Sequence, residues 1–241
     1  MRATIIIPCY NYEKYIGDCI KSCVAQGDCE TIVVDDCSTD GSADIIKKYP
    51  VKYIKTEKNS GYSYAKNIGI KESAGEWIVH IDADDMLVPG SVKTRLDVLN
   101  NFPNSEVIHG YALKIQGDVS YEWCIKNIGK LERHPSKLHA QGFMIHRKVF
   151  ERCGLYYEPL RSKSDKEYWY RIGIHDKTPL PSQVDKRRCH CDVAFYRRHE
   201  NAMHKMRNKN PVYDNEIEKI FDSRIKQLLK EGITKENTKF L

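Results

Sequence analysis

The chain has 241 residues, of which 41% are hydrophobic and 30% charged, and its formal net charge is +6. This length fits one large α/β domain or two small ones, and no apolar stretch approaches the roughly 20 residues that span a bilayer. Residues 1–4 lead into a short strand rather than a signal peptide, so we expect a cytoplasmic protein without a transmembrane segment. The nine cysteines are therefore expected to be reduced thiols.

The N-terminal half alternates apolar runs of strand type with segments of helical spacing. Strands are predicted at residues 4–7, 31–34, 51–54 and 77–81. Between them, apolar residues recur at helical spacing in residues 15–23, 43–49 and 64–70. This alternation predicts an α/β fold with a mostly parallel, doubly wound sheet and helices on both faces.

The strand at residues 77–81 ends in three carboxylates, Asp82, Asp84 and Asp85. Acids this close repel one another unless a cation is present, and a dense set of hard oxygen ligands suits Mg²⁺ or Mn²⁺. In an open α/β sheet, ligands bind at the carboxyl ends of the strands. The alternative is a solvated turn in which Asp84 or Asp85 caps the next helix.

Two more strands end in polar loops, at residues 8–12 and 35–40, which a parallel sheet places along the same edge. A pyrimidine nucleotide fits such loops, because Tyr10 offers an aromatic face to the base and the Asp36 carboxylate can accept the uracil N3 proton. The alternatives are a partly buried Tyr10 and a role for Asp35 and Asp36 in helix capping.

Five motifs along the chain occur in the order of successive signatures of family-2 glycosyltransferases with the GT-A fold. They are IIIPCYN at 5–11, VVDDCSTDGS at 33–42, NSG and AKNIG within 59–69, AGEWI at 74–78 and DADD at 82–85. The resemblance continues through residues 143–171 and 196–199 and covers roughly residues 3–205. It implies inverting transfer of a sugar from a nucleotide diphosphate donor, expected to be a UDP-sugar, with help from Mn²⁺ or Mg²⁺.

The resemblance also implies roles for individual residues. Asp165 stands at the position of the catalytic base, with Ser164 replacing the usual glutamate and Glu167 as the nearest rival. The metal ligands are expected to be Asp84, Asp82 and His199. Substrate contacts are expected from Pro8, Tyr10, Asp36, Asn59, Lys66, Asn67, Asp82, Trp169 and Arg171.

Two departures from the family pattern and three simpler interpretations stand beside these roles. Cys37 occupies a position where glycine is common, and Lys66 one where arginine is frequent. Asp165 could instead be a helix N-cap, Trp169 a core aromatic and His199 a surface histidine in a basic loop.

We expect a single GT-A domain at residues 1–210, with a nucleotide-sugar-binding half at 1–115 and an acceptor-side half at 116–210. Residues 116–139 read as an irregular polar stretch that contributes to the acceptor site. Residues 211–241 form a C-terminal extension whose amphipathic helix packs on the domain or on a partner chain, which allows a homo-oligomer.

The acceptor is the least determined part of this prediction. Residues 186–209 hold eight Lys or Arg against two acids, so a glycan or glycoconjugate acceptor, a nucleic acid or a solvated basic loop all fit. Family resemblance favours the glycan. The alternatives are transfer to a hydroxylated DNA base and a non-catalytic nucleotide-sugar-binding module. A nucleotidyltransferase or a dinucleotide-dependent oxidoreductase is disfavoured, because residues 8–11 contain no glycine.

Overall fold

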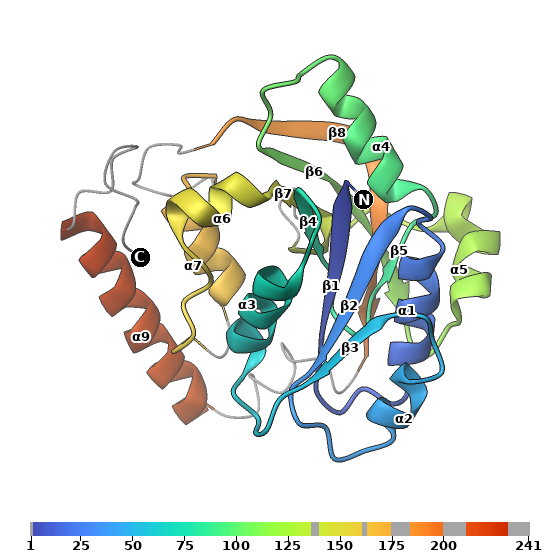
Figure 1. The fold of residues 1–241 in the computed structure, drawn as a ribbon, viewed down its shortest axis with the longest axis horizontal. Coiled ribbons are helices and arrows are strands. Elements are labelled where there is room, and N and C mark those ends of the chain that lie inside the picture. Colours follow the sequence, from blue (N-terminus) through green and yellow to red (C-terminus); the bar gives the residue numbers. More distant parts are fainter. Residues whose placement is uncertain (1, 136–139, 161–162, 175–183, 200–210, 231–241) are drawn as a thin grey trace.

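A computed structural model describes residues 2–135, 140–160, 163–174, 184–199 and 211–230. Its centre is a sheet of eight strands in the order β3-β2-β1-β4-β7-β6-β8-β5 (Figure 1). The strands are β1 (Ala3–Cys9), β2 (Cys29–Asp35), β3 (Lys52–Lys55), β4 (Trp77–His80), β5 (Met86–Leu87), β6 (Val107–Gln116), β7 (Phe143–His146) and β8 (Lys186–Arg198).

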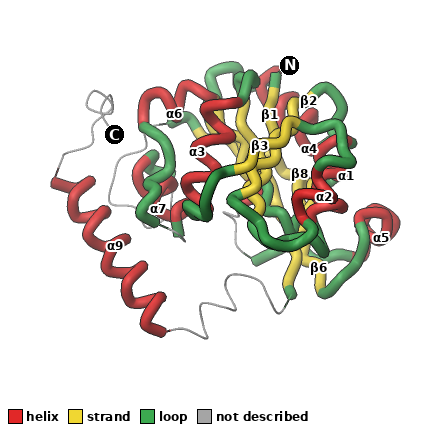
Figure 2. The backbone as a smooth tube through the Cα atoms, turned by 60° about the horizontal axis from the view of Figure 1, so that its bottom comes forward, coloured by secondary structure: helices red, strands yellow, loops and turns green. Residues whose placement is uncertain are grey.

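Helices cover both faces of this sheet. They are α1 (Ile16–Val24), α2 (Ser42–Ile46), α3 (Tyr62–Glu72), α4 (Ser91–Asp97), α5 (Tyr121–Asn127), α6 (Arg147–Cys153), α7 (Ser164–Arg171) and α9 (Pro211–Lys230), with short 3-10 turns η1 (Val98–Asn100), η2 (Ile128–Lys130) and η3 (Ala140–Gly142). Figure 2 shows α3, α6 and α7 on one side of the sheet and α1, α2 and α4 on the other. The α/β class and the two helical layers are therefore as predicted.

The central strands are apolar on both faces because both faces are covered. All seven residues of β1 are buried, and they alternate between the two cores. Ile5 and Ile7 pack with α1 residues such as Ile16, whereas Ile6 packs with Ile70 of α3. This double burial explains why the strand reads as a continuous apolar run in the sequence.

The sheet is mixed rather than uniformly parallel. Strands β3, β2, β1 and β4 pair in parallel, as the strand-helix alternation predicted. Beyond them β7 lies antiparallel between β4 and β6, β8 runs parallel to β6, and β5 pairs antiparallel with β8. The second half of the chain thus extends the sheet by a mixture of antiparallel pairs and one parallel pair, β6 with β8, whose strands are joined by a crossover that includes β7, α6 and α7.

In the second half, one expectation is wrong, and the alternative of a basic loop is wrong for the part of it that the structure describes. The stretch expected to be irregular contains α5, whose start is capped by Ser120: its Oγ accepts a hydrogen bond from the Trp123 N–H at 3.2 Å. The basic region beginning at Lys186 is not a loop, because its residues up to Arg198 form the long strand β8. The rest of that basic region, residues 200–209, lies outside the described residues.

The C-terminal helix α9 packs against α7 on the side away from the sheet (Figure 1). Its Phe221 is buried in a small apolar cluster with Leu160, flanked by Tyr157 and Tyr170. Among the helices that the structure describes, none combines the length and apolar character needed to cross a bilayer.

Candidate active site

Asp82, Asp84 and Asp85, called here the acid cluster, form the turn between β4 and β5. Each can offer an oxygen to a common ligand, and these oxygens lie within 4.8 Å of one another. The turn is fixed from β8: the Arg197 backbone N–H donates to Asp85 Oδ1 at 2.7 Å, and its Nε donates to the Asp84 carbonyl at 2.9 Å. The acids are therefore held together by a strand far along the chain.

The electrostatics of the acid cluster suit a cation. Burial and the Asp84 charge raise the pKa of Asp82 to about 7, and burial with both neighbouring carboxylates raises the pKa of Asp85 well above its usual range. Asp85 Oδ2 is buried and has no hydrogen-bond partner within the described part of the chain. Carboxylates that repel one another, with one oxygen that lacks a partner, fit Mg²⁺ or Mn²⁺.

His199 lies directly beside the acid cluster. Its Nε2 is 2.9 Å from Asp84 Oδ2, and its ring stacks at a tilt 4.7 Å from Tyr15. Only 7% of the residue is exposed, so the surface-histidine interpretation is wrong. An imidazole nitrogen next to a carboxylate is a plausible donor pair for a divalent metal, and His199 remains our predicted third ligand.

Two side chains that the sequence reasoning missed hold the Asp82 carboxylate. The Tyr62 hydroxyl of α3 donates to Oδ1, and Gln141 Nε2 of η3 donates to Oδ2 at 2.5 Å. Tyr62 directly follows the glycine that opens α3. This position is a local sequence signal that Tyr62 lies near a loop at the end of a strand. Gln141 has no such signal, because it reaches Asp82 only through the antiparallel insertion of β7.

The structure brings Asp165 to this site although it lies far from the acid cluster in sequence. Lys66 Nζ donates to Asp165 Oδ1, and its ammonium lies 4.2 Å from the Tyr62 ring centre and 4.5 Å from that of Tyr156. The Lys66 side chain is 1% exposed and that of Asp165 is 23% exposed. Asp165 is also among the charges that raise the pKa of Asp82. A carboxylate thus faces solvent beside the acid cluster.

Asp165 is not the N-cap of α7. Lys163 occupies that position with φ of +62°, and Asp165 lies within the first helical turn. Its rival Glu167 is fully buried, and Arg171 donates to both of its carboxylate oxygens, at 3.0 and 2.8 Å. Of the two carboxylates, Asp165 is the one that a substrate can reach.

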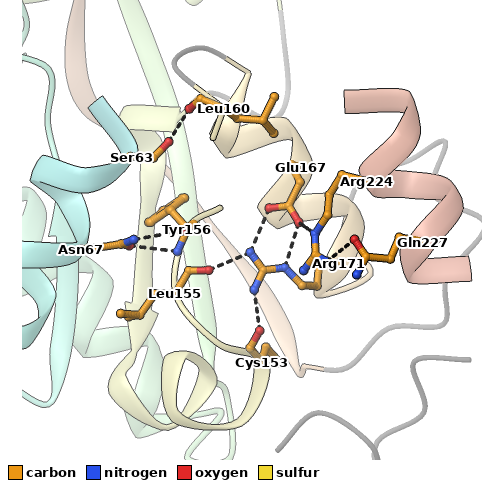
Figure 3. A network of polar contacts seen from close by, with 10 residues as sticks. All are labelled: Ser63, Asn67, Cys153, Leu155, Tyr156, Leu160, Glu167, Arg171, Arg224 and Gln227. Atoms are coloured by element: carbon orange, nitrogen blue, oxygen red, sulfur yellow. Dashed lines mark hydrogen bonds and ion pairs between the residues drawn. The ribbon is translucent and has the colours of Figure 1, made fainter. Parts of the chain in front are cut away.

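The environment of Arg171 differs from the one expected for a residue that contacts the substrate. It is 1% exposed, and besides Glu167 it donates to the carbonyls of Cys153 at 2.6 Å and Leu155 at 2.8 Å (Figure 3). Asn67 is likewise buried, and its side chain pairs with the backbone N–H and carbonyl of Tyr156, both at 2.9 Å. This geometry favours structural roles for Arg171 and Asn67.

The nucleotide-side loops hold Asp36 in a network of donors. Its Oδ1 accepts from Thr56 Oγ1 and the Ser60 N–H, both at 3.0 Å, and its Oδ2 accepts from the Gly61 N–H at 2.6 Å. Asp36 therefore fixes the start of α3, and Oδ2 retains one lone pair for a ligand. The capping and uracil interpretations are compatible.

The remaining predicted contacts lie around these loops. Tyr10 is 42% exposed, so its ring is accessible to a base. Pro8 is buried within β1, Asn59 lies half-buried in the loop before α3, and Trp169 packs at 5.0 Å against Phe143. The last contact leaves Trp169 half-buried, which fits the core interpretation better than an open stacking platform.

Cys37 stands at a position where glycine is common, and its backbone has a conformation that glycine adopts more easily. It has φ of +64°, a left-handed conformation that L side chains adopt at a cost of about 1–2 kcal/mol. The backbone shape that glycine would allow is therefore kept, and the polar loop after β2 retains its course.

A row of polar loops beside a largely buried acid cluster, on a mixed sheet covered by helices on both faces, is the arrangement of the GT-A class of glycosyltransferase fold. Residues 4–169 match the glycosyl transferase family 2 model, and the chain belongs to this family.

Similar proteins agree with this assignment. An uncharacterised glycosyltransferase of Rickettsia prowazekii is 30% identical over 185 residues, which are 70% of this chain, and the chain spans 58% of that relative. Residues 1–349 of S. aureus TarS, in complex with UDP-GlcNAc, superpose with a TM-score of 0.72 at 19% identity, covering 99% of this chain and 69% of the other. The mannosyltransferase PcManGT of Pyrobaculum calidifontis, in complex with GDP-Man and Mn²⁺, superposes with a TM-score of 0.63 at 17% identity, covering 86% and 59%.

Proposed function

We propose that the protein transfers a sugar from a UDP-sugar to an acceptor hydroxyl with inversion at the anomeric carbon. The observation that carries this proposal is that the partly exposed Asp165 carboxylate lies beside the acid cluster. Glycosyl transfer needs a base for the acceptor and charge compensation for the diphosphate, and these two features can supply them. UDP-N-acetylglucosamine is the first donor to test, because TarS binds it in a structure of the same fold.

In this reaction Asp165 acts on the acceptor. Its carboxylate takes the hydroxyl proton while the acceptor oxygen forms a bond to the anomeric carbon from the face opposite the diphosphate. The bond from that carbon to the diphosphate oxygen breaks through an oxocarbenium-like transition state, and UDP leaves with the electron pair. Lys66 orients the base through its ion pair with Asp165.

A divalent cation held by Asp84, with Asp82 and His199, would neutralise the charge that builds on the leaving diphosphate. Tyr62 and Gln141 keep the Asp82 carboxylate in place for this role through their hydrogen bonds. On the nucleotide side, Tyr10 and Asp36 bind the uracil base.

A glycan or glycoconjugate is the acceptor class that the relatives support. TarS, which is 35% identical over 102 residues, is named a poly(ribitol-phosphate) beta-N-acetylglucosaminyltransferase. The structure gives less support to nucleic acid, because part of the positive charge of β8 is not free at the surface: Arg197 is buried, and the exposed Arg187 pairs with Asp185 at 3.3 Å. We therefore keep a surface glycopolymer as the first acceptor to test.

The decisive test is release of UDP from UDP-N-acetylglucosamine, with and without a poly(ribitol phosphate) acceptor and Mn²⁺. Asp165→Asn should lower turnover by about a thousandfold while the affinity for UDP changes less than about twofold, because the base acts in the transition state. Asp97→Asn, which removes an exposed carboxylate of α4, is the matched control and should have no effect. Wild-type turnover in Asp165→Asn would refute the assignment of the base.

A further inference from the structure

The helix that carries Asp165 is covered by α9. Phe221 of α9 packs with Leu160, and its ring meets that of Tyr170 edge to face at 5.8 Å. Arg224, on the same side of α9 one turn later, points toward Glu167 of α7 (Figure 3). The C-terminal helix thus contacts α7 through both apolar and charged side chains.

Glu167 is a buried anion with two cationic partners. Arg171 donates to both of its oxygens, and Arg224 Nε lies 3.5 Å from Oε1. Both arginines are themselves buried, at 1% and 6% exposure. Because a buried charge is tolerated only when it is paired, Arg171 restrains the Glu167 carboxylate through two hydrogen bonds, and Arg224 adds a second positive charge at ion-pair distance.

Gln227 fixes the Arg224 side chain from the next turn of α9. Its Oε1 accepts a hydrogen bond from Arg224 NH1 at 3.0 Å (Figure 3). The guanidinium also lies 4.7 Å from the centre of the Tyr157 ring. Arg224 is therefore oriented by its own helix and by the segment before α7 while it contacts Glu167.

The same network reaches α3, the helix of Lys66. Arg171 donates to the Leu155 carbonyl, Asn67 pairs with the backbone of Tyr156, and Ser63 Oγ donates to the Leu160 carbonyl at 2.6 Å (Figure 3). The segment before α7 is consequently tied to α3 on one side and to α7 on the other. Together these contacts set the distance between the helices of Lys66 and Asp165.

The start of α7 is weakly fixed on its own. Lys163 at the N-cap position has a left-handed backbone, and its side chain makes no capping hydrogen bond to the helix. Asp165 lies in this uncapped first turn, two residues before Glu167. Besides its ion pair with Lys66, its position therefore depends on contacts made further along the helix.

We propose that Arg224 is a positioning residue for glycosyl transfer: by holding Glu167 it fixes the first turn of α7 and with it the Asp165 carboxylate. This inference rests on the proposed role of Asp165 as the base. It gives the C-terminal helix a function in the reaction, beyond covering apolar surface.

The test compares Arg224→Met, Arg224→Lys and the control Lys226→Met, which changes an exposed residue of the same helix. For each full-length variant we would measure the melting temperature, the UDP affinity by calorimetry, and kcat and KM for hydrolysis of UDP-N-acetylglucosamine, in which water replaces the acceptor. Each substitution is also made in the Asp165→Asn background.

Arg224→Met should lower kcat by about tenfold with UDP affinity and KM within about twofold of wild type, because Tyr10, Asp36 and the acid cluster, to which we assign the donor, lie outside α7. Arg224→Lys should lower kcat by about threefold, since it keeps the charge and loses the planar fork. Lys226→Met should match wild type. In the Asp165→Asn background, Arg224→Met should cause no further loss, because its effect passes through Asp165.

Unchanged kcat in folded Arg224→Met, a parallel fall in UDP affinity, or an additional loss in the Asp165→Asn background would overturn the inference. If Arg224→Met does not fold, Arg224→Lys decides, and a wild-type kcat in that variant overturns it. The failure of the proposed function has a separate signature: Asp165→Asn then hydrolyses the donor as fast as wild type, whatever Arg224 does.

Discussion

Replacing Asp36 by asparagine tests the dual role of this carboxylate. Asp36 accepts hydrogen bonds from Thr56, Ser60 and Gly61. An asparagine has one acceptor oxygen, so the amide group would face the Gly61 N–H and leave that donor unpaired. A hydrogen bond to a charged group contributes about 1.5–3 kcal/mol, and an unpaired buried donor costs a similar amount, so we expect the free energy of unfolding to fall by about 2–4 kcal/mol.

Asp36→Asn should also weaken UDP binding by about tenfold, because the uracil N3 proton loses a charged acceptor. The neighbouring Asp35→Asn is the matched control. Asp35 is fully buried and accepts from the Ser38 N–H and the Tyr53 hydroxyl, both at 2.8 Å, so its loss should destabilise the fold without changing UDP affinity by more than about twofold. Urea unfolding and calorimetry with UDP, at a temperature where both variants are folded, separate the effects. Equal losses of UDP affinity would refute the role of Asp36 in binding uracil.

Two further predictions concern the cation and the packing of α3. Asp84→Asn should lower UDP-sugar turnover by about tenfold or more, and adding Mn²⁺ to the variant should restore none of it. A chelator should lower the turnover of the wild-type protein to a similar extent, and equal turnover in chelator and in Mn²⁺ would contradict the metal site. Gly69→Ala should cost about 1–3 kcal/mol in a denaturant titration, because its Cβ would lie 2.3 Å from Ile6 Cγ2. Gly129→Ala, where a Cβ meets no described atom within 4 Å, should cost less than about 0.5 kcal/mol, and a similar loss at both positions would show that the contact with Ile6 is not the cause.

The first half of the fold was predictable because its elements are determined locally. Each strand is buried on both faces and so reads as an unbroken apolar run, and each helix follows it within a short connection. Pairing of such neighbours in parallel follows general rules of chain handedness. The strand-end positions of Tyr10, Asp36 and the acid cluster could be predicted for the same reason.

The second half was less predictable because its geometry depends on distant partners. Nothing in the sequence of β7 shows that it enters the sheet antiparallel between β4 and β6, and only this placement brings Gln141 to Asp82. Arg171 was expected at the substrate because a motif gives its position on α7. The motif does not show the direction of its side chain, which follows from packing against Glu167. Helix α5 was missed because its seven residues, fewer than two full turns, are too few to establish a helical period.

The anchoring of the acid cluster by Arg197 has a consequence for the order in which the protein is made. The two hydrogen bonds that fix this turn join residues 112 and 113 positions apart. On the ribosome, the strands that carry the nucleotide loops can pair early, since their contacts are short in sequence. The acid turn gains its anchor only after the whole of β8 has emerged, so we expect a nascent chain arrested before that strand to have the polar loops of β1 and β2 in place and an acid cluster still open to rearrangement.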